Sequence, residues 1–281
     1  MLIDAHAHLN FPAFEEDLEE VIKRTLEGNV WVINIGTNYQ SSKRAVEIAE
    51  NHKEGIFATV GLHPINLETG LVKLKKDSSE EADFENDFDF EKYKSLAISK
   101  KVVAIGEIGL DFYYKPKTAG KKEVFKEKQK ELLLKELTLA KELNLPVIFH
   151  CRMAHQDLLE ILKLKIKNQK SKTTGLIHGF VGKEQELEGY LNLGYYIGFN
   201  GIIFKKIEGI NFEENIKKTP LEKIILETDS PYLAPPEKEG QRNEPLHLKY
   251  VLKKVSQIKG LSQEELARVT TQNAKTFFGI K

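Results

Sequence analysis

The sequence has little that would indicate a secreted or membrane protein. Its only cysteine is Cys151, so no internal disulfide can form and we expect a reducing compartment. No apolar run approaches the length of a membrane span, and no basic segment followed by an apolar run stands near Met1. We therefore expect a cytoplasmic protein without membrane contact, and nothing in the sequence indicates an obligate protein partner.

The sequence also lacks an excess of either charge. Basic and acidic residues number 42 each, which gives no overall attraction to a polyanion such as nucleic acid. A basic rim confined to one part of the surface would still be enough to bind one. Charge balance therefore leaves a nucleic-acid partner open.

Short apolar runs alternate with longer amphipathic stretches along the whole chain. We count about eight runs, at 2–9, 30–37, 56–64, 102–112, 146–152, 174–180, 195–203 and 223–231. Runs that are apolar on both sides are typical of parallel strands covered by helices. Eight such runs, each followed by helix-like sequence, predict a (β/α)8 TIM-type barrel formed by one domain over residues 1–281.

One acidic segment interrupts this alternation. Residues 77–92, inside a predicted loop insertion at about 68–92, combine acidic residues with interspersed phenylalanines. We predict a solvent-exposed excursion, extended or mobile, from the loop after the third strand. The alternative is a lid, or an acidic patch that repels polyanions.

Polar residues end most of the predicted strands, and in a parallel barrel these carboxyl ends form the active-site rim. His6 and His8 point to the same side of an extended strand, because they are two residues apart. Since a barrel closes its eighth strand against its first, we expect Asp229 beside them. The predicted rim residues are His6, His8, His63, Glu107, His150, His178, Asn200 and Asp229.

These residue types provide the ligands for two metal ions. His6, His8 and Asp229 would hold one ion and His150 with His178 the other, with Glu107 as the bridge. Burial of so many ionisable groups without a metal would be costly. The histidines favour Zn²⁺ or Mn²⁺, and the carboxylates permit Mg²⁺, so the identity of the two divalent ions stays open.

Residues near the same rim are candidates for substrate binding. Arg152, Arg242 and Asn243 could bind phosphate groups, and ordinary structural contacts are the alternative for each. Glu227 lies two residues before Asp229, so it would orient a metal ligand from a deeper layer or fill the barrel interior. Aromatic side chains that could stack on an unpaired base, or simply pack, are Phe112, Tyr113, Tyr114 and Tyr232.

The order of short motifs resembles the TatD family of metal-dependent deoxyribonucleases, which belongs to the amidohydrolase-like barrels. The motifs are DAHAHL (4–9), GLHP (61–64), GEIGLDF (106–112), FHCR (149–152), IHGF (177–180), ETDSPYLAP (227–235) and RNEP (242–245). The resemblance runs the length of the chain and implies the same six metal ligands. It also places His63 in the substrate cleft, against the phosphate or the leaving group.

The leading prediction is a two-metal hydrolase that cleaves DNA phosphodiesters as an exonuclease on single strands. A metal-bridging hydroxide would attack phosphorus, and Asp229 would take the proton. The ligands support hydrolysis, whereas the DNA substrate follows from the resemblance alone. The alternatives are ester or amide hydrolysis on the same centre, such as D-aminoacyl-tRNA deacylation or opening of a small cyclic amide, and a catalytically silent binding protein. Cationic clamps along a groove would favour nucleic acid, and a closed small pocket would favour a small substrate.

Overall fold

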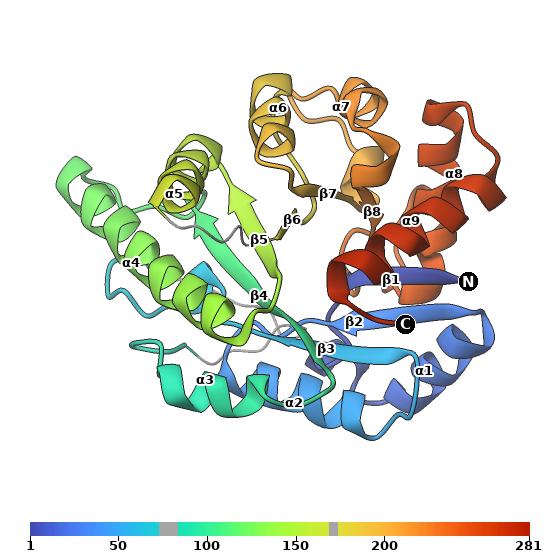
Figure 1. Cartoon of the computed structure of the whole chain (residues 1–281), viewed down its shortest axis with the longest axis horizontal. Helices are drawn as coiled ribbons and strands as arrows, with labels where there is room; N and C mark the ends of the chain where they lie inside the picture. The colour runs from blue at the N-terminus through green and yellow to red at the C-terminus, as the bar shows by residue number, and fades with distance from the viewer. Residues whose placement is uncertain (73–83, 169–173) are drawn as a thin grey trace.

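The computed structural model describes residues 1–72, 84–168 and 174–281 (Figure 1). In these ranges eight parallel strands pair in chain order and alternate with helices, which confirms the predicted TIM-type (β/α)8 barrel. The strands are β1 (Leu2–Ala7), β2 (Val30–Asn34), β3 (Ile56–Val60), β4 (Val102–Asp111), β5 (Val147–Arg152), β6 (Gly175–Ile177), β7 (Tyr196–Phe199) and β8 (Ile224–Leu226). No helix among the described residues is both long and apolar enough to cross a membrane.

Helices surround the strands and cover their outer faces (Figure 1). They are α1 (Leu18–Glu27), α2 (Tyr39–Glu50), α3 (Phe90–Ala97), α4 (Ala119–Leu143), α5 (His155–Asn168), α6 (Glu184–Asn192), α7 (Phe212–Lys218), α8 (Leu248–Lys259) and α9 (Gln263–Phe278). Polar caps set several of their starts, as where the Asn38 side chain accepts a hydrogen bond from Ser41 N at 2.7 Å at the start of α2. Asn144 ends α4 in the left-handed conformation, with a φ of 53°.

The barrel closes just beyond the end of β8. The backbone N–H of Asp229 donates to the carbonyl oxygen of His6 at 2.8 Å. One layer deeper, the buried Asp4 carboxylate accepts hydrogen bonds from Thr228 N at 2.8 Å and Thr228 Oγ1 at 2.5 Å. Burial raises the pKa of Asp4 well above its ordinary value, although these hydrogen bonds oppose the shift. The closure brings Asp229 against His6 and His8, as the order of strands predicts.

Helix α9 covers the amino-terminal end of the barrel. Phe277 and Phe278 pack in one buried cluster with Ile3 of β1 and Ile225 of β8. The Asn273 side chain donates to the carbonyl oxygens of Leu221 and Ile224, both at 2.8 Å, where the chain enters β8. With this end filled by apolar side chains, the carboxyl ends of the strands are left for the functional site.

The structure of the acidic segment, residues 77–92, differs from the solvent-exposed excursion that we predict from the sequence. Residues 73–83 lie outside the described part, but several side chains in the rest of the segment pack against the protein. The Glu85 side chain accepts hydrogen bonds from Tyr39 N at 2.6 Å and from the Tyr93 hydroxyl at 2.7 Å. Phe88 is buried in the main core, and α3 begins within the segment. The predicted solvated excursion is therefore wrong for Glu85, Phe88 and Phe90, which anchor α3 to the barrel, whereas the charged residues between them are exposed.

Candidate metal centre

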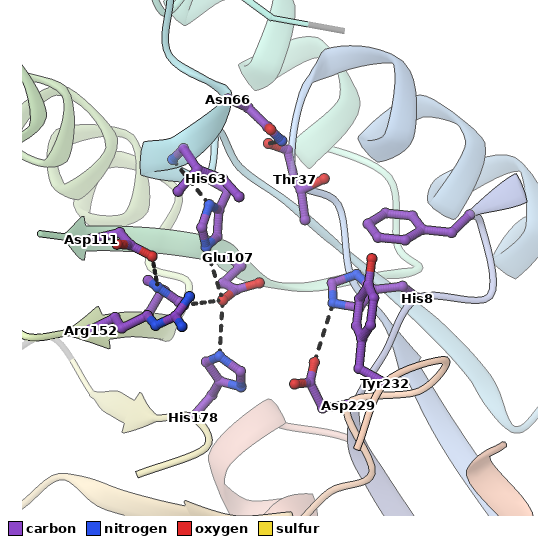
Figure 2. A pocket seen from close by; sticks show the side chains of 13 residues that line it. His8, Thr37, His63, Asn66, Glu107, Asp111, Arg152, His178, Asp229 and Tyr232 are labelled. Carbon is purple, nitrogen blue, oxygen red and sulfur yellow. Dashed lines mark hydrogen bonds and ion pairs between the residues drawn. The ribbon is translucent and has the colours of Figure 1, made fainter. Parts of the chain in front are cut away.

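Five histidines and two carboxylates meet at the carboxyl ends of the strands. His6 is the fifth residue of β1, Glu107 lies on β4 and His150 lies on β5, whereas the others follow strand ends. Figure 2 shows His8 and Asp229 facing Glu107, His63 and His178 across one pocket. The residues that the structure brings together are His6, His8, His63, Glu107, His150, His178 and Asp229.

His6, His8 and Asp229 form the first ligand group. The two Nε2 atoms are 3.2 Å apart, and Asp229 Oδ1 lies 3.7 Å from His6 Nε2 and 3.6 Å from His8 Nε2. His8 Nδ1 lies 3.3 Å from the carbonyl oxygen of Ile35, which can only accept, so Nδ1 carries the proton and Nε2 a lone pair. Two nitrogens bound to one tetrahedral zinc ion would lie about 3.3 Å apart. The group therefore fits a cation that accepts all three lone pairs.

Glu107 lies between this group and the remaining histidines. Its Oε2 atom is 3.4 Å from His6 Nε2, whereas its Oε1 atom is 2.8 Å from His150 Nδ1 and 2.9 Å from His178 Nε2. Burial disfavours the charged carboxylate, but electrostatic interactions with the surrounding histidines, His178 above all, and a hydrogen bond from His150 outweigh it and hold the pKa of Glu107 well below its ordinary value. Glu107 is thus an ionised carboxylate with one oxygen directed to each side.

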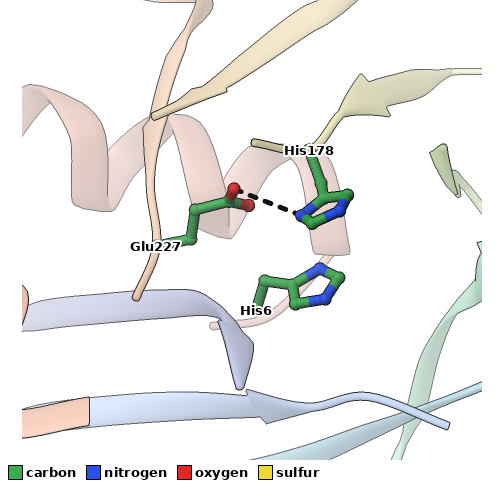
Figure 3. Close-up of side chains that lie close together, drawn as sticks. All are labelled: His6, His178 and Glu227. Carbon is green, nitrogen blue, oxygen red and sulfur yellow. Dashed lines mark ion pairs between the residues drawn. The ribbon is translucent and has the colours of Figure 1, made fainter. Parts of the chain in front are cut away.

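His178 is oriented by a buried carboxylate (Figure 3). Its Nδ1 atom lies 3.4 Å from Glu227 Oε1, and its Nε2 atom faces Glu107. Glu227 is fully buried and also accepts hydrogen bonds from Gly179 N at 2.5 Å and Asn200 Nδ2 at 3.2 Å. A carboxylate that receives one ring N–H fixes the tautomer whose other nitrogen can bind a metal. This contact is consistent with the orienting role predicted for Glu227.

His150 is oriented in the same way by Asp111, to which we gave no role from the sequence. His150 Nε2 lies 3.1 Å from Asp111 Oδ2. Burial opposes protonation of His150, but the hydrogen bonds to Asp111 and Glu107 outweigh it and raise the pKa of His150 to about 9. Asp111 is itself held by a hydrogen bond from Tyr113 N to its Oδ1 atom at 2.9 Å. The signal was present in GEIGLDF, because residues four apart share one face of an extended strand.

His63 faces the same carboxylate but with a different tautomer. Its Nδ1 atom accepts a hydrogen bond from Ile65 N at 3.1 Å, so in the neutral ring the proton is on Nε2, which lies 3.4 Å from Glu107 Oε1. Burial, with the nearby charge of His150, lowers the pKa of His63 to about 4, so the ring is neutral at pH 7. His63 is therefore a hydrogen-bond donor toward the pocket, although its position also groups it with Glu107 and His150 as possible ligands.

The pocket over these residues has a volume of about 230 Å³. One side is aromatic: the Phe11 ring stacks on His8 with ring centres 4.4 Å apart, and Tyr232 lies next to His8 (Figure 2). The other side carries Arg152, next to Asp111 in the same view. Drug-sized ligands occupy pockets of about 300–1,000 Å³, so this one suits a small group or the end of a chain.

The whole chain from residue 3 to residue 279 matches the family model of the TatD related DNases. The chain belongs to the TatD family. A Bacillus subtilis (strain 168) relative described as uncharacterized metal-dependent hydrolase YabD is 35% identical, over 100% of both chains. The 3'-5' ssDNA/RNA exonuclease TatD of Pantoea ananatis is 34% identical, over 99% of this chain and 100% of that one. Membership of the family makes this protein a metal-dependent hydrolase.

Solved structures agree with the TatD family assignment. The crystal structure of YJJV, a TatD homologue from Escherichia coli, superposes with a TM-score of 0.82 and 31% identity, covering 100% of this chain and 98% of that one. A TatD family hydrolase from Entamoeba histolytica has a TM-score of 0.79 and 25% identity, with 99% and 97% covered. The barrel and its length are therefore those of TatD family structures.

Two predicted substrate-binding residues have structural contacts in this TatD barrel. The Arg242 guanidinium binds both carboxylate oxygens of Asp17, each at 2.7 Å. Asn243 is buried, and its side chain donates to the carbonyl oxygens of Thr228 at 3.0 Å and Tyr232 at 2.7 Å. Neither is among the described residues that line the pocket. These contacts match the structural alternative given for both residues: Arg242 ties the loop after β8 to Asp17, and Asn243 ties that loop to itself, so phosphate binding by either residue stays a prediction.

Proposed function

We propose that this TatD family protein is a two-metal phosphodiesterase that removes nucleotides from the end of single-stranded DNA. The observation that carries the proposal is the position of Glu107, whose two oxygens face separate groups of histidines at 3.4 Å and 2.8 Å. A carboxylate placed in this way could bridge a pair of divalent ions, which act together in two-metal hydrolysis. The relative named as a 3'-5' ssDNA/RNA exonuclease supports the choice of substrate.

The ligands divide into two sets around Glu107. His6, His8 and Asp229 would hold the first ion, and His150 with His178 the second. Imidazole and carboxylate ligands fit Zn²⁺ or Mn²⁺, and Mg²⁺ is compatible with the carboxylates. When bound, such ions would supply Lewis-acid activation of water and charge stabilisation at a phosphoryl oxygen. Ile35 and Asp111 fix the ring nitrogens of His8 and His150 that face away from the pocket, and Glu227 lies 3.4 Å from the corresponding nitrogen of His178, which supports preorganised ligating nitrogens in these three residues.

Other side chains of the pocket have roles that follow from their protonation and position. The Asp229 carboxylate would accept the proton of the attacking water, since its Oδ1 atom faces the first ligand group. Neutral His63 would donate a hydrogen bond from Nε2 to a phosphate or leaving-group oxygen. Arg152, on the opposite wall from Tyr232, would bind the phosphate through two N–H groups.

The small pocket also favours a second candidate function. A volume of about 230 Å³ would suit an ester or amide substrate, such as the aminoacyl end of a tRNA or a small cyclic amide. The reaction would use the same residues, because water activation and a proton acceptor serve either bond. The two functions differ in whether the protein recognises a phosphate backbone outside the pocket.

A panel assay separates these functions. Metal-reconstituted protein is incubated with end-labelled single-stranded DNA, duplex DNA, RNA and D-aminoacyl-tRNA, and the products are resolved by length. We expect stepwise shortening of single-stranded DNA, and its loss in the Asp229→Asn variant, whose amide cannot accept the proton. Equal cleavage by Asp229→Asn would indicate a contaminating nuclease. Deacylation of D-aminoacyl-tRNA without nucleotide release would replace the proposal by the second function.

A further inference from the structure

The rim beside Arg152 carries an exposed aromatic and basic surface that the metal chemistry does not use. We propose that this surface, formed by Arg152, Tyr113, Tyr114 and the lysines of residues 115–122, is the track on which the unpaired strand lies as its end enters the pocket. The inference rests on the proposed nuclease function and adds the path of the substrate outside the metal centre. We call this surface the 113–122 track.

The track begins at the wall of the pocket. Arg152 lines the pocket, and its guanidinium carbon lies 3.7 Å from the ring centre of Tyr113 and 5.8 Å from that of Tyr114. The two tyrosine rings are 5.0 Å apart and perpendicular. Tyr113 is 49% exposed and Tyr114 is 40% exposed, although Arg152 covers one face of the Tyr113 ring. A base stacked on an exposed tyrosine is a sequence-tolerant contact worth about 1–3 kcal/mol.

Tyr113, at the start of the 113–122 track, is linked to the metal centre through the carboxylate of Asp111. Asp111 accepts a hydrogen bond from Tyr113 N at 2.9 Å with one oxygen, and the other faces His150 Nε2 at 3.1 Å. Phe112 N donates to the carbonyl oxygen of Arg152 at 2.9 Å, which holds the end of β4 to the end of β5. A base on Tyr113 would therefore stand in a set position relative to the ligands.

Positive charge continues the track away from the pocket. Residues 112–122 contain four lysines and no acidic residue, in a chain whose net charge is zero. Lys115, Lys117 and Lys121 are exposed, and the first turn of α4 has no acidic residue. Lysines at a helix N-terminus oppose the helix dipole, so their presence there does not serve the stability of α4. Lysines next to stacking aromatics are the combination that binds a single-stranded backbone.

An unpaired strand fits this surface better than a duplex. Stacking needs a base with a free face, which a duplex offers only at its end. The pocket of about 230 Å³ admits one end of a chain. Single-strand sites on other folds hold about 4–16 nucleotides, and a track of this kind falls within that class.

Binding without cleavage tests the track. The affinity of labelled oligothymidylate of about 12 nucleotides is measured by anisotropy in chelator, over a range of salt, for parent and K115Q/K117Q/K121Q protein. Each lost phosphate contact lowers the slope of log affinity against log salt by about 0.7, so the triple variant should lose about 2. K53Q/K100Q/K253Q removes the same charge at other exposed positions and should keep the parental slope. Melting temperatures check that each variant is folded.

The tyrosine platform has its own variants. Tyr113→Leu should weaken binding of the long strand about 5- to 150-fold, the equivalent of ~1–3 kcal/mol, whereas Tyr113→Phe keeps the stacking face and should bind as the parent. In cleavage assays with metal, the preference for the long strand over a dinucleotide, measured as the ratio of kcat/KM values, should fall for both the lysine and the Tyr113→Leu variants.

The outcomes separate this inference from the proposed function. A parent that cuts single-stranded DNA while the track variants keep its salt slope and its length preference would overturn the track alone. A parent that neither binds nor cuts nucleic acid would overturn the proposed function and the track with it. Equal weakening by the control triple variant would show a general charge effect and would also contradict the track.

Discussion

Asp111 and His150 are joined by a 3.1 Å hydrogen bond between Oδ2 and Nε2, and this bond directs the other ring nitrogen of His150 to Glu107. With both nitrogens facing carboxylates, the pKa of His150 rises to about 9 despite burial. A cation at Nδ1 must displace one proton, and the Asp111 contact ensures that the remaining proton is on Nε2. Asp111 therefore acts on the metal centre through the orientation of His150.

Asp111→Asn should weaken metal binding by about 10- to 100-fold, as is usual when a carboxylate behind a ligating histidine is lost. The amide matches the carboxylate in size but carries no charge to stabilise the ring proton. Competition with a chelating dye measures the affinity directly. Asp89→Asn, which keeps a side chain able to cap α3 far from the pocket, is the control. Equal metal affinities for Asp111→Asn and the control would mean that Asp111 only stabilises the turn at Tyr113 and does not act on the metal centre.

Phe88 should matter for stability although it lies in the acidic segment. It is 4% exposed within the main core, so Phe88→Ala should lower the free energy of unfolding by about 3–5 kcal/mol. Phe84 in the same segment is 37% exposed, and Phe84→Ala should cost clearly less. Denaturant unfolding of both variants gives the comparison. Similar small losses of unfolding free energy in both variants would mean that Phe88 is not anchored in the core and that the segment is exposed, as the sequence suggests.

Glu136 should make stability depend on pH. It is fully buried on α4, with Oε1 accepting a hydrogen bond from Leu62 N at 2.8 Å, and burial raises its pKa well above the ordinary value. A carboxyl with a raised folded-state pKa stabilises the fold below its unfolded pKa of about 4.3, and this contribution is lost as pH rises through the folded pKa.

Glu136→Gln keeps the acceptor for Leu62 without the charge. Its melting temperature relative to the parent should therefore increase as pH is raised from about 5 to about 9. Exposed Glu131 on the same helix provides the control, and Glu131→Gln should show a flat difference. A flat difference for Glu136→Gln as well would mean that the buried carboxyl is ionised across this range without a cost.

Strand ends made the site predictable. In a parallel barrel every strand delivers its last residues to one rim, so histidines at the ends of separate runs had to converge. His6 and Asp229, more than 200 positions apart in the sequence, meet because β8 closes on β1. The fold and the collection of ligand types followed from the period of the apolar runs.

Side-chain partners across the fold were not predictable in the same way. The sequence leaves both a phosphate contact and an ordinary ion pair open for Arg242, and only the structure shows that its partner is Asp17. The role of Asp111 was not predicted because its partner, His150, lies on the next strand, and only the fold sets the register between the two strands. The acidic segment misled because its charges suggested solvent, whereas its phenylalanines and Glu85 decide its packing.

Anomalous diffraction from crystals of the zinc-loaded protein would show whether Glu107 joins two divalent ions. We predict two peaks, one among His6, His8 and Asp229 and one between His150 and His178, with Glu107 contacting both. The anomalous maps of Glu107→Gln crystals should lose at least one of these peaks. A single peak in the parent, or one held by His6, His178 and Glu227 with Glu107 uninvolved, would show that Glu107 is not a bridge between two ions.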